Sequence, residues 1–339
     1  MNLCITGGGT GGHLMIAEAL VEAATKAGHS AIFIGSTHGQ DRKYFEKSSA
    51  FKAVYFLETT GVVNQKGLGK LKALSKVFKA FLKARRVIKD EKIDAVYSVG
   101  GFSAAPAAFA SIFIRVPLFI HEQNAVYGRL NRLLKPFAKC FTSAYDKDSA
   151  IKGYPVKKIF SSTQRVRDKL NIIIFLGGSH GAKAINDLAL SKAQKLQKIG
   201  IHIIHQSGEA DYERVKNSYK ELGVEVELYS FTKELPSLIV QADLAVSRAG
   251  ASTLWELTTN GCPALFIPYP YAAGNHQYFN AKFIVDDCMG WCELENQQLS
   301  FALDAILVKP DLKKRSTKLL QFSNKDVAKE MINEVEDMI

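Results

Sequence analysis

Three glycine-rich turns are the parts of this sequence best suited to bind a ligand. Each follows a short apolar run that predicts a β-strand and precedes a segment that predicts a helix. Glycine lets the backbone approach a ligand closely, and the free N–H groups at a helix start attract phosphate or another electron-rich oxygen. The turns therefore predict sites for an anionic ligand, with a tight structural turn as the alternative; they lie at residues 7–12, 177–181 and 248–253.

Two common nucleotide-binding motifs do not match the first turn. A Walker A loop ends in Gly-Lys followed by Ser or Thr, whereas this turn ends in Gly11-Gly12-His13. A dinucleotide-binding fold has Asp or Glu at the end of its second strand, and the corresponding run, AIFIGST at 31–37, has no carboxylate. Hydride transfer is therefore disfavoured. The five cysteines are scattered, and no paired Cys/His spacing completes a zinc site, so we expect no metal and no cofactor.

The elements that carry the turns alternate between short apolar runs and amphipathic segments, which is typical of parallel sheets covered by helices. A polar, basic stretch at 143–168 interrupts the alternation, which restarts at Asn171 and includes the run VEVELY at 224–229. A chain of 339 residues with 47% hydrophobic residues is long enough for two packed domains. We expect an α/β protein with two doubly wound, Rossmann-like domains facing a deep cleft, at 1–157 and 158–322, and a C-terminal helix at about 323–339 that can pack back on the first domain.

Positive charge is concentrated in the first half of the chain. Residues 1–150 contain 21 Lys and Arg against 11 Asp and Glu, whereas residues 151–339 contain 23 against 22. This asymmetry indicates an anionic partner for the first half, either nucleic acid or an anionic membrane surface; the alternative is a merely soluble basic protein. No apolar run is long enough to span a membrane and no signal peptide is evident, so we expect the protein to stay in the cytoplasm.

Most of the excess charge lies at 66–92, where ten Lys and Arg oppose only Asp90 and Glu91. An apolar stripe flanked by lysines is what an interfacial helix needs at an anionic leaflet. The alternative is a helix that packs its apolar face on the sheet, with the lysines in water. At helical spacing the apolar face comprises Leu68, Leu71, Leu74, Val77, Phe78, Phe81 and Leu82, and the adjacent stripe comprises Lys72, Lys76, Lys79 and Lys83.

Six motifs occur in the order, and at about the spacing, found in one family: GGGTGGH, SVGGFSAAP, HEQN, GGSHGA, SRAGASTLWE and NHQYFNA. From residue 2 to about 285 the chain resembles the bacterial cell-wall N-acetylglucosaminyltransferases of the GT-B fold. The resemblance implies transfer of N-acetylglucosamine from UDP-N-acetylglucosamine to lipid I, the muramyl-pentapeptide-pyrophosphoryl-undecaprenol acceptor, giving lipid II and UDP. It also implies inversion at the anomeric carbon without a metal, by a peripheral protein on the cytoplasmic face of the inner membrane.

Matching the motifs position by position implies donor-binding roles. Thr10, Gly11 and Gly12 resemble the loop that faces the sugar and the acceptor, and Asn124 of HEQN resembles a donor-sugar contact. In the second half the matched positions are Ser179 near the donor phosphate or nucleoside, Thr232 whose backbone contacts uracil, Ala251, Ser252 and Thr253 at the diphosphate and sugar turn, Glu256 at the ribose, and Gln277 at a sugar hydroxyl.

Two positions depart from the family pattern. Ile16 follows the first turn where the family commonly has proline. The family's Gly-Asn-Pro-Val-Arg is here Gly-Tyr-Pro-Val-Lys at 153–157, and Lys157 keeps the charge of that arginine, a donor contact, but lacks its bidentate geometry.

Sugar transfer to a hydroxyl needs a base for the hydroxyl and a fixed positive environment for the departing diphosphate. His13, at the tip of the first turn, is the leading candidate for the base, because a neutral imidazole accepts a proton near pH 7; the alternative is a helix-start residue that only orients the loop. His121 and Glu122 are the reserve candidates for the base. They are the first two residues of HEQN, which ends a predicted strand.

Two other classes of function remain open from the sequence. Another GT-B glycosyltransferase or a UDP-sugar epimerase would share the turns of the second half, although GGGTGGH and HEQN together argue against both. A nucleic-acid-binding protein would use the basic half, but few aromatic residues interleave the lysines and no stacking platform is visible. We therefore expect UDP-N-acetylglucosamine, lipid I and an anionic membrane surface as partners, and no nucleic acid.

Overall fold

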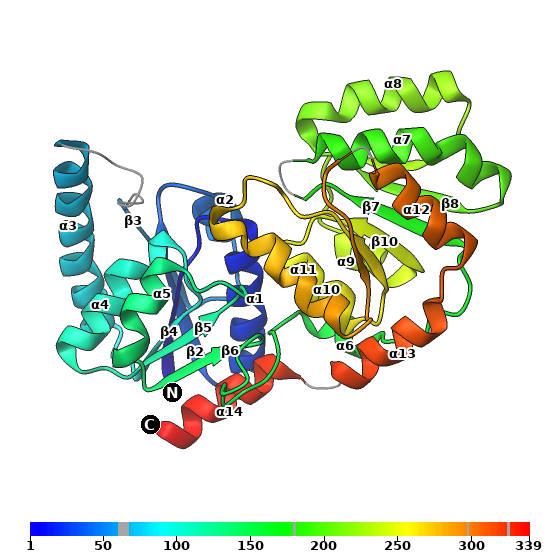
Figure 1. Ribbon diagram of the computed structural model, residues 1–339. Helices are drawn as coiled ribbons and strands as arrows, with labels where there is room; N and C mark the ends of the chain where they lie inside the picture. The colour runs from blue at the N-terminus through cyan, green and yellow to red at the C-terminus, as the bar shows by residue number, and fades with distance from the viewer. Residues whose placement is uncertain (60–67, 179–180, 297, 324–325) are drawn as a thin grey trace. The chain divides into compact units, whose positions relative to one another are not determined.

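The computed structural model describes residues 1–59, 68–178, 181–296, 298–323 and 326–339, and of residues 68–74 the helical backbone alone (Figure 1). Within it the chain forms two compact units, which we treat separately. Unit 1 comprises residues 1–157 together with 326–339, and unit 2 comprises residues 158–325.

Unit 1 is built on a six-stranded parallel sheet in the order β3-β2-β1-β4-β5-β6. Its strands are β1 (Asn2–Thr6), β2 (Ser30–Ser36), β3 (Ala53–Leu57), β4 (Ala95–Ser98), β5 (Leu118–Glu122) and β6 (Cys140–Ser143). Its helices are α1 (Gly11–Lys26), α2 (Asp41–Phe45), α3 (Leu68–Asp90), α4 (Ala105–Ile114), α5 (Arg129–Leu134) and α14 (Val327–Met338), with short 3-10 turns at Phe102–Ala104 and Lys135–Phe137.

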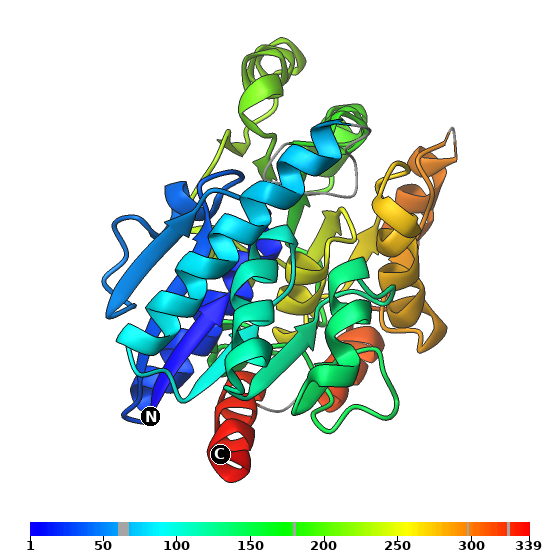
Figure 2. The ribbon, with the colours of Figure 1, turned by 90° about the vertical axis from the view of Figure 1, so that its left-hand side faces the viewer.

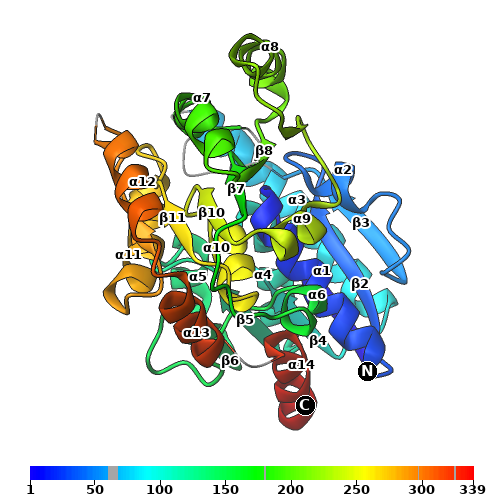
Figure 3. The ribbon, with the colours of Figure 1, turned by 90° about the vertical axis from the view of Figure 1, so that its right-hand side faces the viewer.

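The two faces of this sheet are covered by different helices. On one face α3 and α4 lie side by side, and Ala80, Ala84 and Ile88 of α3 join the apolar core (Figure 2). On the other face α1 is held by buried residues at helical spacing, and α14 packs against it (Figure 3). Ile16, the residue in place of the family's proline, is fully buried in α1.

Unit 2 has a second six-stranded parallel sheet, in the order β9-β8-β7-β10-β11-β12. Its strands are β7 (Ile172–Leu176), β8 (His202–Gln206), β9 (Glu227–Tyr229), β10 (Leu244–Ser247), β11 (Ala264–Phe266) and β12 (Trp291–Cys292). Its helices are α6 (Lys158–Ser162), α7 (Lys183–Lys198), α8 (Tyr212–Leu222), α9 (Leu235–Gln241), α10 (Ala251–Thr259), α11 (His276–Asp286), α12 (Leu299–Val308) and α13 (Leu312–Phe322), with 3-10 turns at Glu209–Asp211 and Ala273–Asn275.

The core of unit 2 lies between the sheet and the helices α7, α8 and α12, which supply Ile185, Val215 and Leu303 to it. Each unit thus has the doubly wound strand order 3-2-1-4-5-6 when its strands are counted from its first. Expectations of an α/β protein and of two Rossmann-like parallel-sheet domains are confirmed. In both units the glycine-rich turns follow the carboxyl ends of strands, where ligands bind in sheets of this type.

Candidate functional site

The first glycine turn packs backbone against backbone with a second turn of unit 1. β1 and β4 are neighbours in the sheet, so the turns that follow them meet. The N–H of Gly8 donates to the carbonyl of Gly100 at 3.1 Å. A Cβ on Gly101, whose φ is +82°, would lie 2.1 Å from the Gly8 oxygen. Any side chain at Gly101 would therefore push the two turns apart.

A buried carboxylate holds the first turn from the other side. Asp41, at the start of α2, is fully buried and accepts hydrogen bonds from the N–H of Gly9 at 2.6 Å and from the N–H of Ser36 at 2.8 Å. Ser36 is the last residue of β2. As the sequence indicates, β2 itself has no carboxylate. The Asp41 carboxylate lies at its carboxyl end instead, and backbone N–H groups of the protein occupy both of its oxygens.

His13 lies in the first turn of α1 and is half-buried. Its Nδ1 is 2.9 Å from the hydroxyl of Thr10, an exposed residue, and its Nε2 is 2.7 Å from the amide nitrogen of Gln123. Thr10 is the N-cap of the helix, with extended backbone, and Gly11 and Gly12 form its first turn. The structure thus brings Thr10, His13 and the HEQN segment together within unit 1.

His121 is more deeply placed than His13. It is fully buried on β5, and its Nδ1 lies 3.1 Å from the Thr142 hydroxyl on β6. Burial lowers the pKa of His121 to about 3, with a further contribution from His13. Its ring is therefore neutral at physiological pH.

Glu122 holds the segment that follows β5. It is 2% exposed and accepts hydrogen bonds from the N–H groups of Asn124 at 3.0 Å and Gly128 at 2.8 Å, and from the Asn131 amide at 2.9 Å. Burial raises the pKa of Glu122, and these hydrogen bonds oppose the shift. The half-buried Asn124 is thus positioned through its backbone by the Glu122 carboxylate.

Lys157 pairs with Glu18 of α1 at 2.9 Å.

In unit 2 the third turn leads into the N-terminus of α10. Gly250 is the N-cap of this helix and has no side chain that could cap it, so the first N–H groups of Ala251, Ser252 and Thr253 meet no capping side chain at that position. Ser252 donates to the carboxylate of Glu256 at 2.9 Å, and Glu256 is 6% exposed.

The remaining predicted residues of unit 2 come from three other places. Gln277, in the first turn of α11, accepts the N–H of Tyr269 at 2.9 Å, and the hydroxyl of Thr232 accepts the N–H of Glu234 at 3.0 Å. Ser179 lies outside the described residues.

Arg248 is a residue of the third turn to which sequence reasoning gave no role. Its guanidinium pairs with Glu295 at 2.8 Å and donates to the carbonyls of Ile267 and Pro268 at 3.2 and 3.3 Å. It also lies over the ring of Tyr269 at 5.5 Å. Arg248 therefore links the carboxyl ends of β10 and β11. In the sequence, only its position in the third turn could have indicated a functional role.

Sequence reasoning also missed one Asp-x-Asp sequence, a spacing that can clamp a metal ion. Asp146, two residues before Asp148, follows β6; it accepts the hydroxyl of Tyr127 and the N–H of Asp148 and pairs with Lys135 at 3.5 Å. These contacts lower its pKa, with the Tyr127 hydrogen bond as the largest cause. Across the described part of the chain, no group of three or more His, Cys, Asp or Glu side chains could hold a metal ion.

The basic helix α3 exposes part of its predicted apolar face. Phe78 is 60% exposed and Leu82 is 46% exposed, while Phe81 is half-buried between Phe78 and Phe113 of α4, with ring centroids 6.0 and 5.7 Å apart. Phe113 is 67% exposed. We call Phe78, Leu82 and Phe113 the α3–α4 patch.

Lysines border this patch unequally. Lys79 and Lys83 are exposed, whereas Lys76 pairs with Glu58 at 2.7 Å. The side chains of Leu68, Leu71, Lys72 and Leu74 lie outside the described residues. Helix α3 packs on the core mainly through Ala80, Ala84 and Ile88, which were not predicted for the apolar face, and Phe81 of the predicted face packs against the same core. Of the helices in the part of the chain that is described, none is long and apolar enough to cross a membrane.

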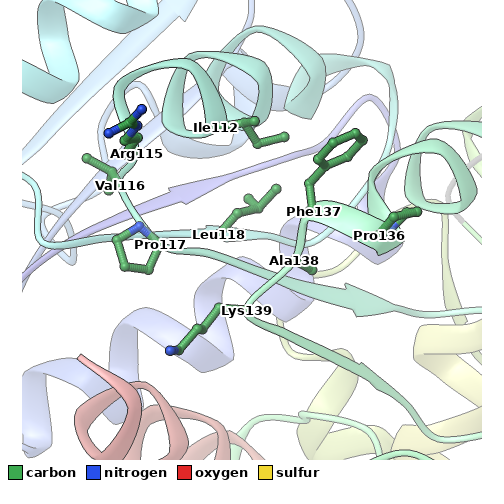
Figure 4. Close-up of a pocket in the computed structure, with 9 residues that line it drawn as sticks. All are labelled: Ile112, Arg115, Val116, Pro117, Leu118, Pro136, Phe137, Ala138 and Lys139. Carbon is green, nitrogen blue, oxygen red and sulfur yellow. The ribbon is translucent and has the colours of Figure 1, made fainter.

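A surface pocket of about 390 Å³ lies elsewhere in unit 1, at the amino ends of β5 and β6. Figure 4 shows Ile112 and Phe137 above Leu118, with the Lys139 side chain extending away from them. The glycine turns and HEQN follow the carboxyl ends of strands, so this pocket is separate from the candidate site.

Comparisons with known proteins place both halves of the chain in one family. Residues 3–143 match the N-terminal domain model of glycosyltransferase family 28, and residues 172–331 match its C-terminal domain model. A relative from Sulfurimonas denitrificans, a UDP-N-acetylglucosamine–N-acetylmuramyl-(pentapeptide) pyrophosphoryl-undecaprenol N-acetylglucosamine transferase, is 64% identical over 99% of this chain and 98% of its own.

Solved structures agree with this placement. MurG of Acinetobacter baumannii matches with a TM-score of 0.78 and 26% identity over 99% of both chains. UDP-GlcNAc 2-epimerase of Neisseria meningitidis matches over the full length of both chains with a TM-score of 0.66, but at 14% identity it shares the fold alone. The chain is therefore a glycosyltransferase that belongs to family 28, and within that family to the MurG N-acetylglucosamine transferases.

Proposed function

We propose that this enzyme transfers N-acetylglucosamine from UDP-N-acetylglucosamine to lipid I, forming lipid II and UDP in peptidoglycan synthesis. The observation that carries the proposal is the 64% identity, over nearly the whole chain, to a relative named for that transfer. The geometry supports the proposal. The half-buried imidazole of His13 and the N-terminus of α10, which has no capping side chain, each follow the carboxyl end of a strand.

The donor is proposed to bind unit 2. The N-terminus of α10 offers backbone N–H groups and the positive end of a helix dipole to the diphosphate, without a metal. Glu256 is proposed to hold the ribose, Gln277 a sugar hydroxyl, and the Thr232 backbone the uracil. Ser179, Ala251, Ser252 and Thr253 complete the proposed contacts in unit 2. Arg248 supports this arrangement by fixing the adjacent strand ends.

Unit 1 is proposed to supply the base and to face the acceptor. We choose His13 over His121 and Glu122 because His13 is the most exposed of the three. Thr10, Gly11 and Gly12 are proposed to face the sugar and the acceptor, Asn124 to contact the donor sugar, and Lys157 to contact the donor.

The transfer follows from these roles. The acceptor hydroxyl gives its proton to His13 as its oxygen forms a bond to the anomeric carbon. The bond from that carbon to the UDP oxygen breaks, and its electron pair leaves on the β-phosphate, with inversion at the carbon. The N–H groups of α10 stabilise that charge.

We further propose that the protein is peripheral, on the cytoplasmic face of the inner membrane, and docks there through the α3–α4 patch with Lys79 and Lys83. An exposed aromatic group beside exposed lysines fits an anionic lipid surface, and the acceptor is a membrane lipid.

No nucleic-acid partner is proposed, so a filter-binding assay should find no salt-sensitive affinity for DNA or RNA.

One assay tests the reaction itself. The purified protein, incubated with UDP-N-acetylglucosamine and a lipid I analogue in excess EDTA, should release UDP and form the disaccharide. Absence of release without EDTA contradicts the reaction, whereas release that EDTA alone abolishes contradicts only the metal-free mechanism. Calorimetry with UDP in EDTA separates donor binding from turnover.

A further inference from the structure

Four side chains of unit 1 form a hydrogen-bonded line from the interior to the surface. The Tyr154 hydroxyl, on a residue 3% exposed, donates to Oε1 of Gln123 at 3.4 Å. The amide nitrogen of Gln123, itself 7% exposed, lies 2.7 Å from Nε2 of His13. Nδ1 of His13 lies 2.9 Å from the hydroxyl of Thr10, which is exposed.

The orientation of the Gln123 amide determines which ring nitrogen of His13 carries the proton. The Gln123 amide has its Oε1 toward the Tyr154 hydroxyl and its nitrogen toward His13. An amide nitrogen can only donate, so the ring nitrogen opposite it must carry a lone pair. The proton of the neutral ring is then on Nδ1, where the Thr10 hydroxyl accepts it.

We propose that Gln123 and Tyr154 are positioning residues that hold His13 in the Nδ1–H tautomer, with the lone pair on Nε2. The inference rests on the proposed function, in which His13 is the base. It adds which ring nitrogen takes the proton and which residues select that nitrogen. In the reaction the acceptor hydroxyl takes the place of the Gln123 N–H at Nε2 and gives its own proton to that nitrogen, as the hydroxyl oxygen bonds to the anomeric carbon and UDP departs.

The surroundings keep the line in one arrangement. A Cβ on Gly100 would lie 3.4 Å from Nε2 of His13, so the β4 turn packs closely against the ring. The ring of Tyr154 packs edge-on against His121, with centroids 5.4 Å apart. His121 is neutral at physiological pH, so its ring adds no positive charge beside the line.

Nuclear magnetic resonance of the full-length protein with ¹⁵N-labelled histidine tests the tautomer directly. A two-bond ¹H–¹⁵N spectrum distinguishes the two ring nitrogens, and the His13→Gln variant identifies the His13 signals among those of eight histidines. The wild type should show a proton on Nδ1 and none on Nε2. In Gln123→Glu, an isosteric carboxylate faces Nε2, so the proton should move to that nitrogen.

Kinetics should follow the spectrum. We expect Gln123→Glu to lower kcat roughly tenfold to a hundredfold, part of the usual worth of a general base, with KM for UDP-N-acetylglucosamine changed by less than about twofold. Tyr154→Phe, which frees the amide to turn, should give both tautomers and a smaller loss, on the order of threefold to tenfold. Gln123→Met, which fills the space without a hydrogen bond, should behave like Tyr154→Phe.

Tyr219→Phe is the matched control. It removes the hydroxyl of an equally buried tyrosine in unit 2, which hydrogen-bonds to His205 Nδ1 at 3.0 Å, and should change neither the His13 signals nor kcat. A wild-type proton on Nε2, or a Gln123→Glu variant with unchanged tautomer, overturns the proposal. A tautomer that inverts in Gln123→Glu while kcat stays constant supports the positioning and rejects His13 as the base, so the two failures are distinct.

Discussion

Units 1 and 2 each place a glycine-rich turn after their first strand and start a sixteen-residue helix behind it, α1 in one and α7 in the other. They differ in what holds the site. In unit 1 the buried side chains of Asp41, Glu122 and Gln123 hold backbone N–H groups or an imidazole. In unit 2 the α10 turn offers backbone N–H groups from a helix N-terminus.

This difference separates two chemical tasks on one strand order. Moving a proton needs a side chain held at a defined atom, and unit 1 has the side-chain contacts for that. Stabilising a diphosphate needs positive potential, which a helix N-terminus supplies without a titratable group. On our proposal, the same architecture serves acid–base chemistry in unit 1 and anion binding in unit 2, according to which residues follow the strands.

Each unit has a buried aspartate that accepts two backbone N–H groups, and the two aspartates lie at opposite ends of their sheets. Asp41 of unit 1 holds the turn at the carboxyl end of the sheet. Asp243 of unit 2 is 5% exposed and also accepts two backbone N–H groups, those of Asn171 and Ile172 at 2.9 and 3.0 Å, but at the amino end of β7. The first lies beside the proposed site and the second lies at the opposite end of its sheet.

The largest expected effect comes from the imidazole. His13→Ala should lower turnover by a factor on the order of 10² to 10⁴, the usual worth of general base catalysis, and should leave UDP affinity in unit 2 nearly intact. Steady-state kinetics and UDP calorimetry measure the two quantities. Should turnover persist in His13→Ala and vanish in His121→Ala, the base would be His121.

The two buried carboxylates provide the next comparison. An amide at position 41 has one acceptor oxygen, so Asp41→Asn turns its NH₂ group toward one of the two N–H donors and leaves that donor unsatisfied, at a cost of about 1–3 kcal/mol. We expect kcat/KM to fall roughly tenfold to a hundredfold because the turn that carries Thr10 and His13 shifts.

Asp243→Asn is the control for that experiment. It should lower the stability of unit 2 in denaturant titrations while kcat/KM of the folded enzyme stays within about twofold of wild type. Equal losses of kcat/KM in both variants would show that Asp41 acts through stability alone.

Membrane docking should also distinguish the units. Changing Lys79 and Lys83 of α3 to Gln should weaken binding to anionic vesicles roughly tenfold to thirtyfold at low salt, because each lysine near such a surface attracts it independently. The same two charges removed from α8 of unit 2, as Lys216→Gln with Lys220→Gln, should change binding little. Co-sedimentation measures both, and similar losses in the two variants would mean that net charge, and not the α3–α4 patch, drives binding.

The fold was largely predictable because local pattern determines it. Apolar runs followed by glycine turns predicted β1 and β7, and both are confirmed in parallel sheets. The run VEVELY gave only β9, Glu227–Tyr229. Gly223 ends α8 with a φ of +64°, and the N–H of Val224 donates back to Tyr219, so the first residues of the run close the helix and do not enter the sheet.

The site was less predictable because its contacts are distant in sequence. Asp41 is 32 residues from Gly9, and Gln123 is 110 residues from His13. No spacing rule connects such pairs. HEQN marked a functional segment, but periodicity could not tell that His121 and Glu122 would be buried while Asn124 stays half-buried. Their assigned roles remain predictions.

The smallest expected effect is a pH dependence that isolates unit 2. His205 of β8 is fully buried between Tyr219 and Asn186, and burial lowers its pKa from 6.5 to about 3. The folded protein therefore keeps this histidine neutral where the unfolded chain binds a proton, so its contribution to stability is present above pH 6.5 and is lost as pH falls toward 3.

Both tryptophans, Trp255 and Trp291, lie in unit 2, so their fluorescence reports its unfolding. Between pH 6.5 and 4.5, His205→Gln should reduce the slope of unfolding free energy against pH by up to about 1.4 kcal/mol per pH unit. Equal slopes in wild type and His205→Gln would mean that His205 is protonated in the folded state as readily as in the unfolded chain.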